Sequence, residues 1–395
     1  MSCSRLLLGP ALAATLLVAP AEAQGPPAGL VGDPVAEATR LPGPVQLTFR
    51  EQFVKAGEGY FNPDATKVVF QAVPIPPAGV EPDEFYAMYV ADVVRDRDGT
   101  ISGLTNHLRV SPPGSANTCG WFHPSDPDLL YFATTVTPPT QESAPGYQRS
   151  GRYRWQFPPE MRIVHMHLGR DGIGTAASLH PEVGSGQGYV AEGSVSPDGR
   201  HMVYASLENG GDSNILVRDL RSGNDVAVVT APGYDGGPFF SPDGRRLCYR
   251  SDRRGDNLLQ LFVADLEFDA DGAISGMARE HQLTDNGHVN WAPFWHPAGR
   301  HLIYASSEVG HYNYEVFAVD ADPGDLPGSE PAGSLRYGTR RRRITDATGA
   351  DVLPVFTTDG TWMMWTSKRG AAETSQLWAS PFVMDLDEVP VDGGS

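Results

Sequence analysis

The sequence predicts an all-β fold: a six-bladed β-propeller of four-stranded antiparallel blades, closed by an N-terminal strand that completes the last blade. Three observations lead to this prediction. Gly and Pro are frequent, at 44 and 34 of 395 residues, which is typical of many turns between short strands. One sequence pattern recurs six times along the chain. An outer-strand signature precedes the first repeat, whereas the last repeat lacks one.

The first 23 residues predict a cleavable signal peptide. Arg5 gives the positive start, Leu6–Val18 form an apolar run, and Ala21-Glu22-Ala23 is a small-x-small cleavage site. The apolar run is shorter than the ~20 residues that span a membrane, so we expect no membrane span. We expect cleavage after Ala23 and export to the periplasm or the medium. The predicted divisions are residues 1–23 as signal peptide, 24–44 as Pro/Gly-rich linker, 45–383 as propeller and 384–395 as acidic tail.

The formal net charge is −18, which argues against nucleic acid and anionic lipid as partners, because basic patches bind both. We therefore expect no nucleic-acid partner, and we expect a monomer. Two cysteines, Cys119 and Cys248, remain after Cys3 leaves with the signal. The repeat register places them in different blades at unlike positions, so we expect no disulfide between them.

Each repeat contains a small or acidic residue, an apolar pair, a Pro-Asp-Gly-like turn, a basic residue and an apolar strand. Pro presets φ and Asp-Gly forms the turn, so each copy predicts a hairpin of an inner strand a and a strand b. The shortest spacing, from Pro197 to Pro242, is 45 residues, near the ~40–50 residues of one propeller blade. The six copies begin at Glu58, Cys119, Glu192, Gly237, Ala292 and Leu353.

The outer strand d explains how the ring closes. The sequence predicts strand d at Gln282–Asp285 in the fourth copy and at Arg343–Asp346 in the fifth. The sixth copy has no such segment, whereas Val45–Phe49 carries the same signature ahead of the first copy. We therefore expect Val45–Phe49 to join the last blade and remove two exposed sheet edges.

Three copies carry a family resemblance: Ser196-Pro-Asp-Gly-Arg200, Ser241-Pro-Asp-Gly-Arg245 and His296-Pro-Ala-Gly-Arg300. They resemble the Ser-Pro-Asp-Gly (WD40-like, PD40) repeats of TolB-like six-bladed propellers, over roughly Val45–Phe382. The resemblance implies a periplasmic binding or scaffold protein. The same pattern occurs in the propeller domains of dipeptidyl peptidase IV relatives, but those enzymes need a hydrolase domain with a Gly-x-Ser-x-Gly elbow, for which this chain leaves no residues.

One face of the propeller is predicted to carry the binding site, because the d–a and b–c turns meet there. Asp, Glu and Asn side chains at the starts of the inner strands could hold calcium through oxygen ligands. We favour the simpler interpretation that they form a solvated polar rim capping the strand starts. These side chains are Glu58, Asn117, Glu192, Asp235, Asn290 and Asp351.

Charged and imidazole groups add to this face: His288 precedes strand a of blade five, and the b–c loops of blades four and five provide Arg253, Glu308 and His311. Such a cluster could bind a charged sugar or a transition metal. It is similar, in residue type alone, to the histidine-lined manganese site of oligogalacturonate lyases, which needs histidines from several blades.

The long insertion Thr137–Pro159 holds Arg152 and Trp155 among other aromatic and arginine residues. This composition is typical of binding hot spots, and it is equally consistent with a lid over the channel. By contrast, Asp96–Ser102 and Asp269–Ser275 are interpreted as c–d hairpin turns rather than calcium loops, since both lack the final acidic ligand. His123 and His296 are interpreted as turn caps on the opposite face.

The sequence therefore favours a non-catalytic, exported protein- or glycan-binding scaffold of the cell envelope that needs no cofactor. The alternative is a metal-dependent polysaccharide lyase or hydrolase that holds calcium or manganese at the channel mouth.

Overall fold

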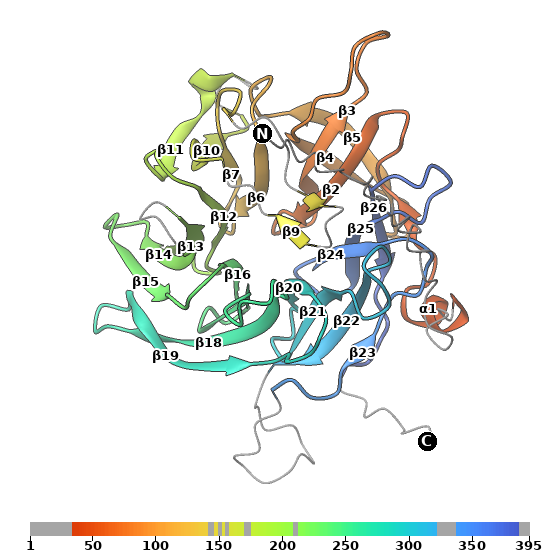
Figure 1. The fold of residues 1–395 in the computed structure, drawn as a ribbon. Helices are drawn as coiled ribbons and strands as arrows, with labels where there is room; N and C mark the ends of the chain where they lie inside the picture. Colours follow the sequence, from red (N-terminus) through yellow and green to blue (C-terminus); the bar gives the residue numbers. More distant parts are fainter. Residues whose placement is uncertain are drawn as a thin grey trace, which may run out of the picture. The chain divides into compact units, whose positions relative to one another are not determined.

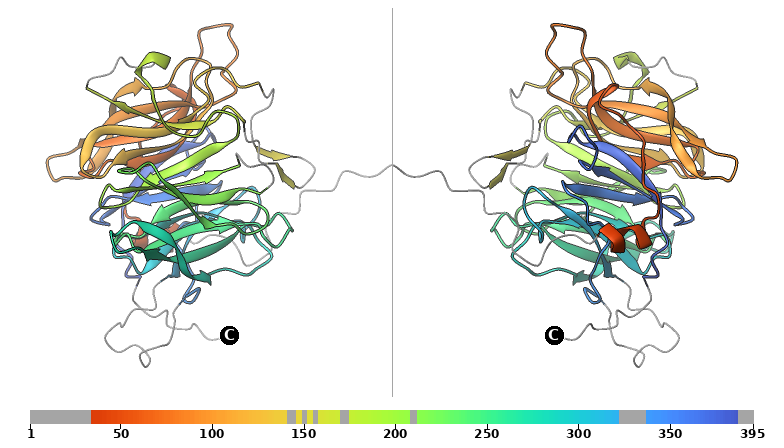
Figure 2. Two further views of the ribbon diagram at one scale, coloured as in Figure 1. Left: turned by 90° about the vertical axis from the view of Figure 1, so that its left-hand side faces the viewer. Right: turned by 90° about the vertical axis from the view of Figure 1, so that its right-hand side faces the viewer.

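The computed structural model describes residues 34–140, 146–148, 152–154, 158–169, 175–207, 212–321 and 337–386. Within these residues six four-stranded antiparallel sheets stand around a central axis, which confirms the predicted propeller (Figure 1). Figure 2 shows the same sheets from two sides. The predicted signal peptide lies outside the described residues. Among the helices of the described residues, none is both long and apolar enough to cross a membrane.

The blades follow one another along the chain, and the strands of each are given below from the inner to the outer one. Blade 1 contains β2 (Phe53–Phe61), β3 (Lys67–Pro74), β4 (Ala87–Arg95) and β5 (Ile101–Arg109). Blade 2 contains β6 (Asn117–His123), β7 (Asp126–Thr134), β10 (Arg162–His167) and β11 (His180–Val183). Blade 3 contains β12 (Val190–Val195), β13 (His201–Ser206), β14 (Asn214–Asp219) and β15 (Asp225–Val229).

Blade 4 contains β16 (Asp235–Phe240), β17 (Arg246–Ser251), β18 (Gln260–Phe268) and β19 (Ile274–Gln282). Blade 5 contains β20 (Asn290–Trp295), β21 (His301–Ser306), β22 (Glu315–Asp320) and β23 (Arg342–Arg343). Blade 6 contains β24 (Asp351–Phe356), β25 (Trp362–Ser367), β26 (Gln376–Pro381) and β1 (Val45–Gln46). The elements outside the blades are α1 (Pro34–Arg40), η1 (Ala176–Ser178) and the hairpin of β8 (Gly146–Gln148) and β9 (Arg152–Arg154).

The core consists of the b and c strands, which neighbouring blades cover on both faces. Every residue of β13, β21 and β25 is buried. The largest fully buried side chains include Trp365, Tyr249 and Tyr304, each from a b strand. Continuous apolar runs are what a sheet buried on both faces requires, so the local sequence identifies these strands well.

The N-terminal segment closes the ring as predicted. Val45 pairs with Ala379 and Gln46 with Trp378, so β1 is the outer strand of blade 6. Beyond β1, the Leu47 N–H donates to the Leu377 carbonyl at 2.8 Å. The last blade thereby gains the fourth strand that its own repeat lacks.

The segments predicted as strand d in blades 4 and 5 overlap that strand by one residue each and otherwise follow it. β19 ends at Gln282 and β23 at Arg343, so the Leu-Thr or Ile-Thr pairs follow strand d. There the threonine hydroxyl accepts a hydrogen bond from a backbone amide of a c strand, in place of a ladder carbonyl. Thr284 accepts from Leu261 N at 2.9 Å, Thr345 from Val316 N at 2.8 Å and Thr48 from Leu377 N at 2.9 Å.

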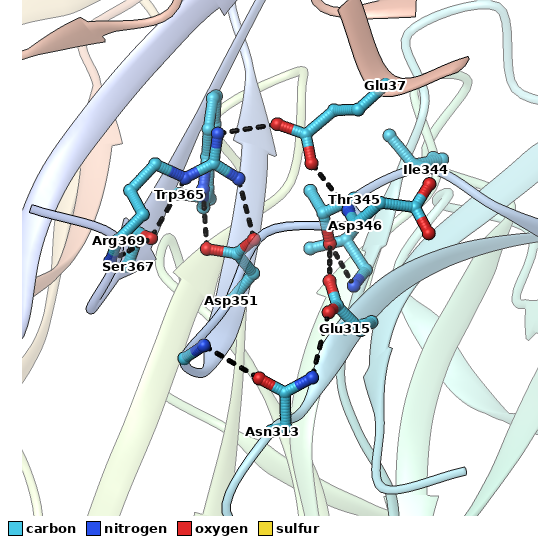
Figure 3. Close-up of polar contacts among 12 residues, drawn as sticks. Glu37, Asn313, Glu315, Ile344, Thr345, Asp346, Asp351, Trp365, Ser367 and Arg369 are labelled. Atoms are coloured by element: carbon cyan, nitrogen blue, oxygen red, sulfur yellow. Dashed lines mark hydrogen bonds and ion pairs between the residues drawn. The ribbon is translucent and has the colours of Figure 1, made fainter. Parts of the chain in front are cut away.

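Part of the predicted linker 24–44 is a helix, α1, that contacts residues of blades 5 and 6. In α1, Glu37 accepts a hydrogen bond from Asp346 N at 2.5 Å and forms an ion pair with Arg369 at 2.6 Å (Figure 3). Arg40 reaches Asp346 at 2.5 Å and the Ile344 carbonyl at 3.0 Å. The start of the predicted acidic tail also packs, because Leu386 is buried.

The Pro-Asp-Gly-like turns have the expected geometry. Gly199, Gly244, Gly299 and Gly360 have φ between 69° and 75°, a left-handed conformation that suits glycine. His123 Nδ1 accepts from Ser125 N at 3.3 Å, and His296 Nδ1 from Ala298 N at 3.2 Å, so both histidines cap their turns. The two Asp-x-Asp-Gly segments close the β4–β5 and β18–β19 hairpins, as predicted.

Candidate functional site

Each inner strand contains a β-bulge at the same position of the repeat. The pairing with strand b slips at each bulge, and all six bulge residues are left-handed, with φ between 44° and 61°. A bulge re-aims the side chain it carries, and here all six bulge residues line one central cavity. They are Glu58, Cys119, Glu192, Gly237, Ala292 and Leu353.

Four aromatic side chains fill the axis two residues beyond the bulges. Tyr60, Trp121, Phe239 and Phe294 pack together with ring centroids 5.2 to 6.4 Å apart. They also line the cavity, and we call them the aromatic floor. The equivalent residues of blades 3 and 6 are the smaller Ser194 and Val355.

The cavity has a volume of about 400 Å³, which is in the range of small-ligand pockets. Its other lining residues come from the inner strands, from the b strands and from nearby loops. Aromatic walls are provided by Tyr86, Tyr189 and Trp291, and charged groups by Lys55 and Glu84. The Lys55 ammonium lies 4.4 Å from the centre of the Tyr86 ring.

On one side of the cavity, the charge of the Glu192 carboxylate is balanced by an ion pair. Its carboxylate lies 3.1 Å from the Arg250 guanidinium and accepts hydrogen bonds from Tyr234 at 2.6 Å and Gly237 N at 2.5 Å. Burial by itself would lower the pKa of Arg250, but Tyr234 and Glu192 raise it above its usual range. Arg250 and Glu192 therefore form a buried ion pair with its own hydrogen-bonding shell.

On the other side, Glu58 has neutral hydrogen-bond donors. Its carboxylate accepts from Thr118 Oγ1 at 3.0 Å, Cys119 Sγ at 3.1 Å and Tyr60 Oη at 3.5 Å. Burial raises the pKa of Glu58, while the hydrogen bonds from Cys119 and Thr118 oppose this rise. Burial, and then the charge of Glu58, raises the pKa of the Cys119 thiol, which therefore keeps its proton and donates a hydrogen bond to Glu58.

The predicted rim residues belong to two different rings. Glu58 and Glu192 are bulge residues, whereas Asn117, Asp235, Asn290 and Asp351 lie two residues earlier, at the first position of their strands, and are buried. The prediction of one solvated rim was therefore wrong. The side chains of the earlier ring tie the strand starts to neighbouring loops.

The contacts of this earlier ring are structural. Asp351 binds Arg369 at 2.6 Å and Trp365 Nε1 at 3.1 Å, as Figure 3 shows. Asp235 accepts from Ala231 N at 3.0 Å and pairs with Arg253 at 3.2 Å. Asn290 donates to Gln260 at 3.1 Å, and Asn117, which also borders the cavity, donates to the Tyr86 carbonyl at 2.9 Å.

The candidates from the b–c loops, and His288 ahead of β20, lie elsewhere than in the cavity lining. Arg253 also pairs with Glu280 at 2.7 Å, and Glu308 pairs with Arg341 at 2.6 Å. His288 is exposed, and His311 packs on Tyr314 with ring centroids 5.8 Å apart. Arg152 lies in β9, but its side chain and the whole of Trp155 fall outside the described residues. In the described part of the chain, no three His, Cys, Asp or Glu side chains gather closely enough to hold a metal ion.

Arg250 is one of the cavity residues that sequence reasoning missed. It lies on β17 and pairs with Gly236, next to the bulge. The residues at the same position of the other b strands are uncharged: Gln71, Ala133, Ala205, Ala305 and Thr366. A single charged residue at an otherwise small or neutral position of the repeat was the available signal.

Residues 182–328 match the family model of PD40, the TolB beta propeller domain, and this segment covers blades 3 and 4 and most of blade 5. Over this segment the chain is similar to the TolB propeller family, and its fold is a six-bladed β-propeller. A protein assigned as TolB from Agrobacterium tumefaciens has a solved structure that is 16% identical, with a TM-score of 0.49, and the match covers 83% of this chain and 91% of that one.

Curated relatives match shorter parts of this TolB-like propeller. Atu1656, an uncharacterised protein of Agrobacterium fabrum, is 25% identical over 137 residues, which make up 33% of this chain and 43% of the relative. Dipeptidyl-peptidase 5 of Porphyromonas gingivalis is 36% identical over 88 residues, 20% of this chain and 13% of that enzyme. The chain therefore spans less than half of the length of these relatives.

Proposed function

We propose that this TolB-like propeller is an exported, non-catalytic binding protein of the cell envelope that receives a segment of a partner protein at its channel mouth. The observation that carries the proposal is the cavity of about 400 Å³ that the six bulge residues and the aromatic floor line. It combines a large apolar surface with a few directed polar groups, which is the usual composition of a binding pocket.

The chemistry of the lining favours binding over catalysis. Glu192 and Arg250 are engaged in an ion pair with each other. The raised pKa of the Cys119 thiol keeps it protonated, so it is not activated as a nucleophile. Aromatic walls such as Trp291 and Tyr86 provide contact area at low entropic cost, as in protein recognition hot spots. The export part of the proposal rests on the N-terminal pattern of Arg5, Leu6–Val18 and Ala21–Ala23.

The proposal can be tested by selecting binders from a random dodecapeptide library displayed on phage, with the mature chain from residue 24 as the target. Synthetic copies of the selected peptides are then measured by calorimetry on two variants. Trp291→Ala removes a cavity wall, and we expect it to weaken binding about tenfold or more. Arg245→Ala changes an exposed turn residue on the opposite face, and we expect it to leave the affinity unchanged.

Two results would contradict the proposal. Peptides that bind Trp291→Ala as tightly as the parent protein would place the binding surface outside the cavity. Cleavage of polyuronides by the metal-loaded protein, together with stoichiometric manganese or zinc by elemental analysis, would instead establish the metal-dependent enzyme. Circular dichroism and thermal melting of both variants check that each is folded.

A further inference from the structure

Two glutamates occupy equivalent bulges of the cavity but differ in what surrounds them. Glu58 and Glu192 have φ of 44° and 61°, and both side chains line the cavity. Glu192 has a guanidinium at 3.1 Å. Within the described residues, no Lys, Arg or His forms an ion pair with Glu58, whose partners are two hydroxyls and a thiol. Of the two bulge carboxylates, Glu192 thus has an ion-pair partner, whereas Glu58 has none within the described residues and is attracted by Arg250 only at longer range.

The other cations of the cavity are already engaged. Arg250 is held by Glu192 and by the Tyr234 hydroxyl at 2.8 Å. Lys55 stands over the Tyr86 ring with Glu84 nearby. An unmatched carboxylate in a partly dehydrated site is stabilised when a ligand cation reaches it, because the attraction between opposite charges is stronger there than in water.

The surroundings of Glu58 suit a cation on an apolar stem. Tyr60, whose hydroxyl lies 3.5 Å from the Glu58 carboxylate, belongs to the aromatic floor, and Trp121 packs on it with ring centroids 5.3 Å apart. Aromatic faces attract ammonium and guanidinium groups and also cover aliphatic stems. The net charge of −18 adds a long-range attraction for basic partners.

We propose that the cavity takes the charged end of a lysine or arginine side chain from the partner segment, with Glu58 as its counter-ion. This inference rests on the proposed function, because it names the chemistry that the partner brings to the same mouth. Glu192 has a different part: it holds Arg250 in place and so keeps that guanidinium from competing for Glu58.

The experiment uses the selected dodecapeptides, each remade with its basic residue replaced by norleucine, which keeps the stem and removes the charge. Binding of each pair is measured on the parent protein, on Glu58→Gln and on Glu267→Gln. The last variant removes the same charge from an exposed residue of β18. Glu58→Gln keeps an oxygen that can accept from Thr118, so we expect it to remain folded, and its melting temperature checks this.

The expected result is that norleucine weakens binding about tenfold or more on the parent protein and on Glu267→Gln, but less than about twofold on Glu58→Gln. An equal loss on the parent and on Glu58→Gln would overturn the role of Glu58 and leave the proposed function standing. Peptides whose binding is weakened by Trp291→Ala but that contain no basic residue would also overturn the role of Glu58 and leave the proposed function standing. A selection that yields no peptide sensitive to Trp291→Ala would overturn the proposed function itself, and this inference with it.

Discussion

Replacing Leu47 by Ala should destabilise the propeller by about 3 kcal/mol, because Leu47 packs the closure of the ring. Leu47 is 1% exposed and belongs to the core cluster that contains Phe53 of blade 1 and Leu377 and Ala379 of blade 6. The change removes three carbons, worth about 2.4 kcal/mol of transfer free energy. The residual cavity adds to this, within the range of about 2–5 kcal/mol for buried Leu→Ala changes.

The substitution isolates packing from hydrogen bonding. An alanine at this position keeps the backbone amide that donates to the Leu377 carbonyl, so the ladder contact of the closure survives. The matched control is Phe49→Ala, two residues along the same segment, because Phe49 is 42% exposed. We expect that control to cost less than about 1 kcal/mol.

The measurement is urea denaturation of the mature chain, followed by tryptophan fluorescence, with the unfolding free energy extrapolated to zero denaturant. A loss for Leu47→Ala within about 0.5 kcal/mol of that for Phe49→Ala would refute the reasoning, since burial would then not set the contribution of the segment. Deleting residues 24–50, which removes α1 and the outer strand of blade 6, should lower the melting temperature further than either point change.

Two further predictions concern buried residues. Burial raises the pKa of Glu315 to about 9, so between about pH 5 and pH 9 the folded protein keeps a proton that the unfolded chain has released. The free energy of unfolding should therefore fall as pH rises through this range. Glu315→Gln should flatten this decline, which urea titrations at several pH values would measure. Gly237→Ala would place a Cβ 1.8 Å from the Arg250 guanidinium at a φ of 59°, and should cost about 2–4 kcal/mol by displacing that group. Gly223→Ala is its control, because Gly223 has a φ of 75° with open space around it, and should cost only the ~1 kcal/mol of the left-handed backbone. Equal losses for the two alanine variants would contradict the steric argument.

Local chemistry made much of the fold predictable. Pro197-Asp198-Gly199 forms a turn because its residues favour that turn's dihedral angles, and continuous apolar runs such as Leu302–Tyr304 become strands buried on both faces. The missing outer strand of the last repeat, together with its copy at Val45–Phe49, was enough to predict the closure. The linker prediction missed α1, whose position depends on ion pairs such as Glu37 with Arg369, 332 positions along the chain.

The candidate site was predictable only as a face of the propeller. A bulge shifts a strand by one residue, and because side chains alternate with a period of two, this shift changes which residues meet. Sequence reasoning therefore merged Glu58 and Glu192 with Asp235 and Asp351, which the structure places in a separate buried ring.

The sequence by itself determined the number of blades, their turns and the strand that closes the ring, because each is written in neighbouring residues. Only the tertiary structure decided which side chains share the cavity and which charges are matched there. Arg250 meets Glu192 from another blade, 58 positions away, whereas Glu58 meets Thr118 and Cys119 from the next blade. Such pairings depend on how the blades curve around the axis, a long-range property that no local pattern of residues encodes.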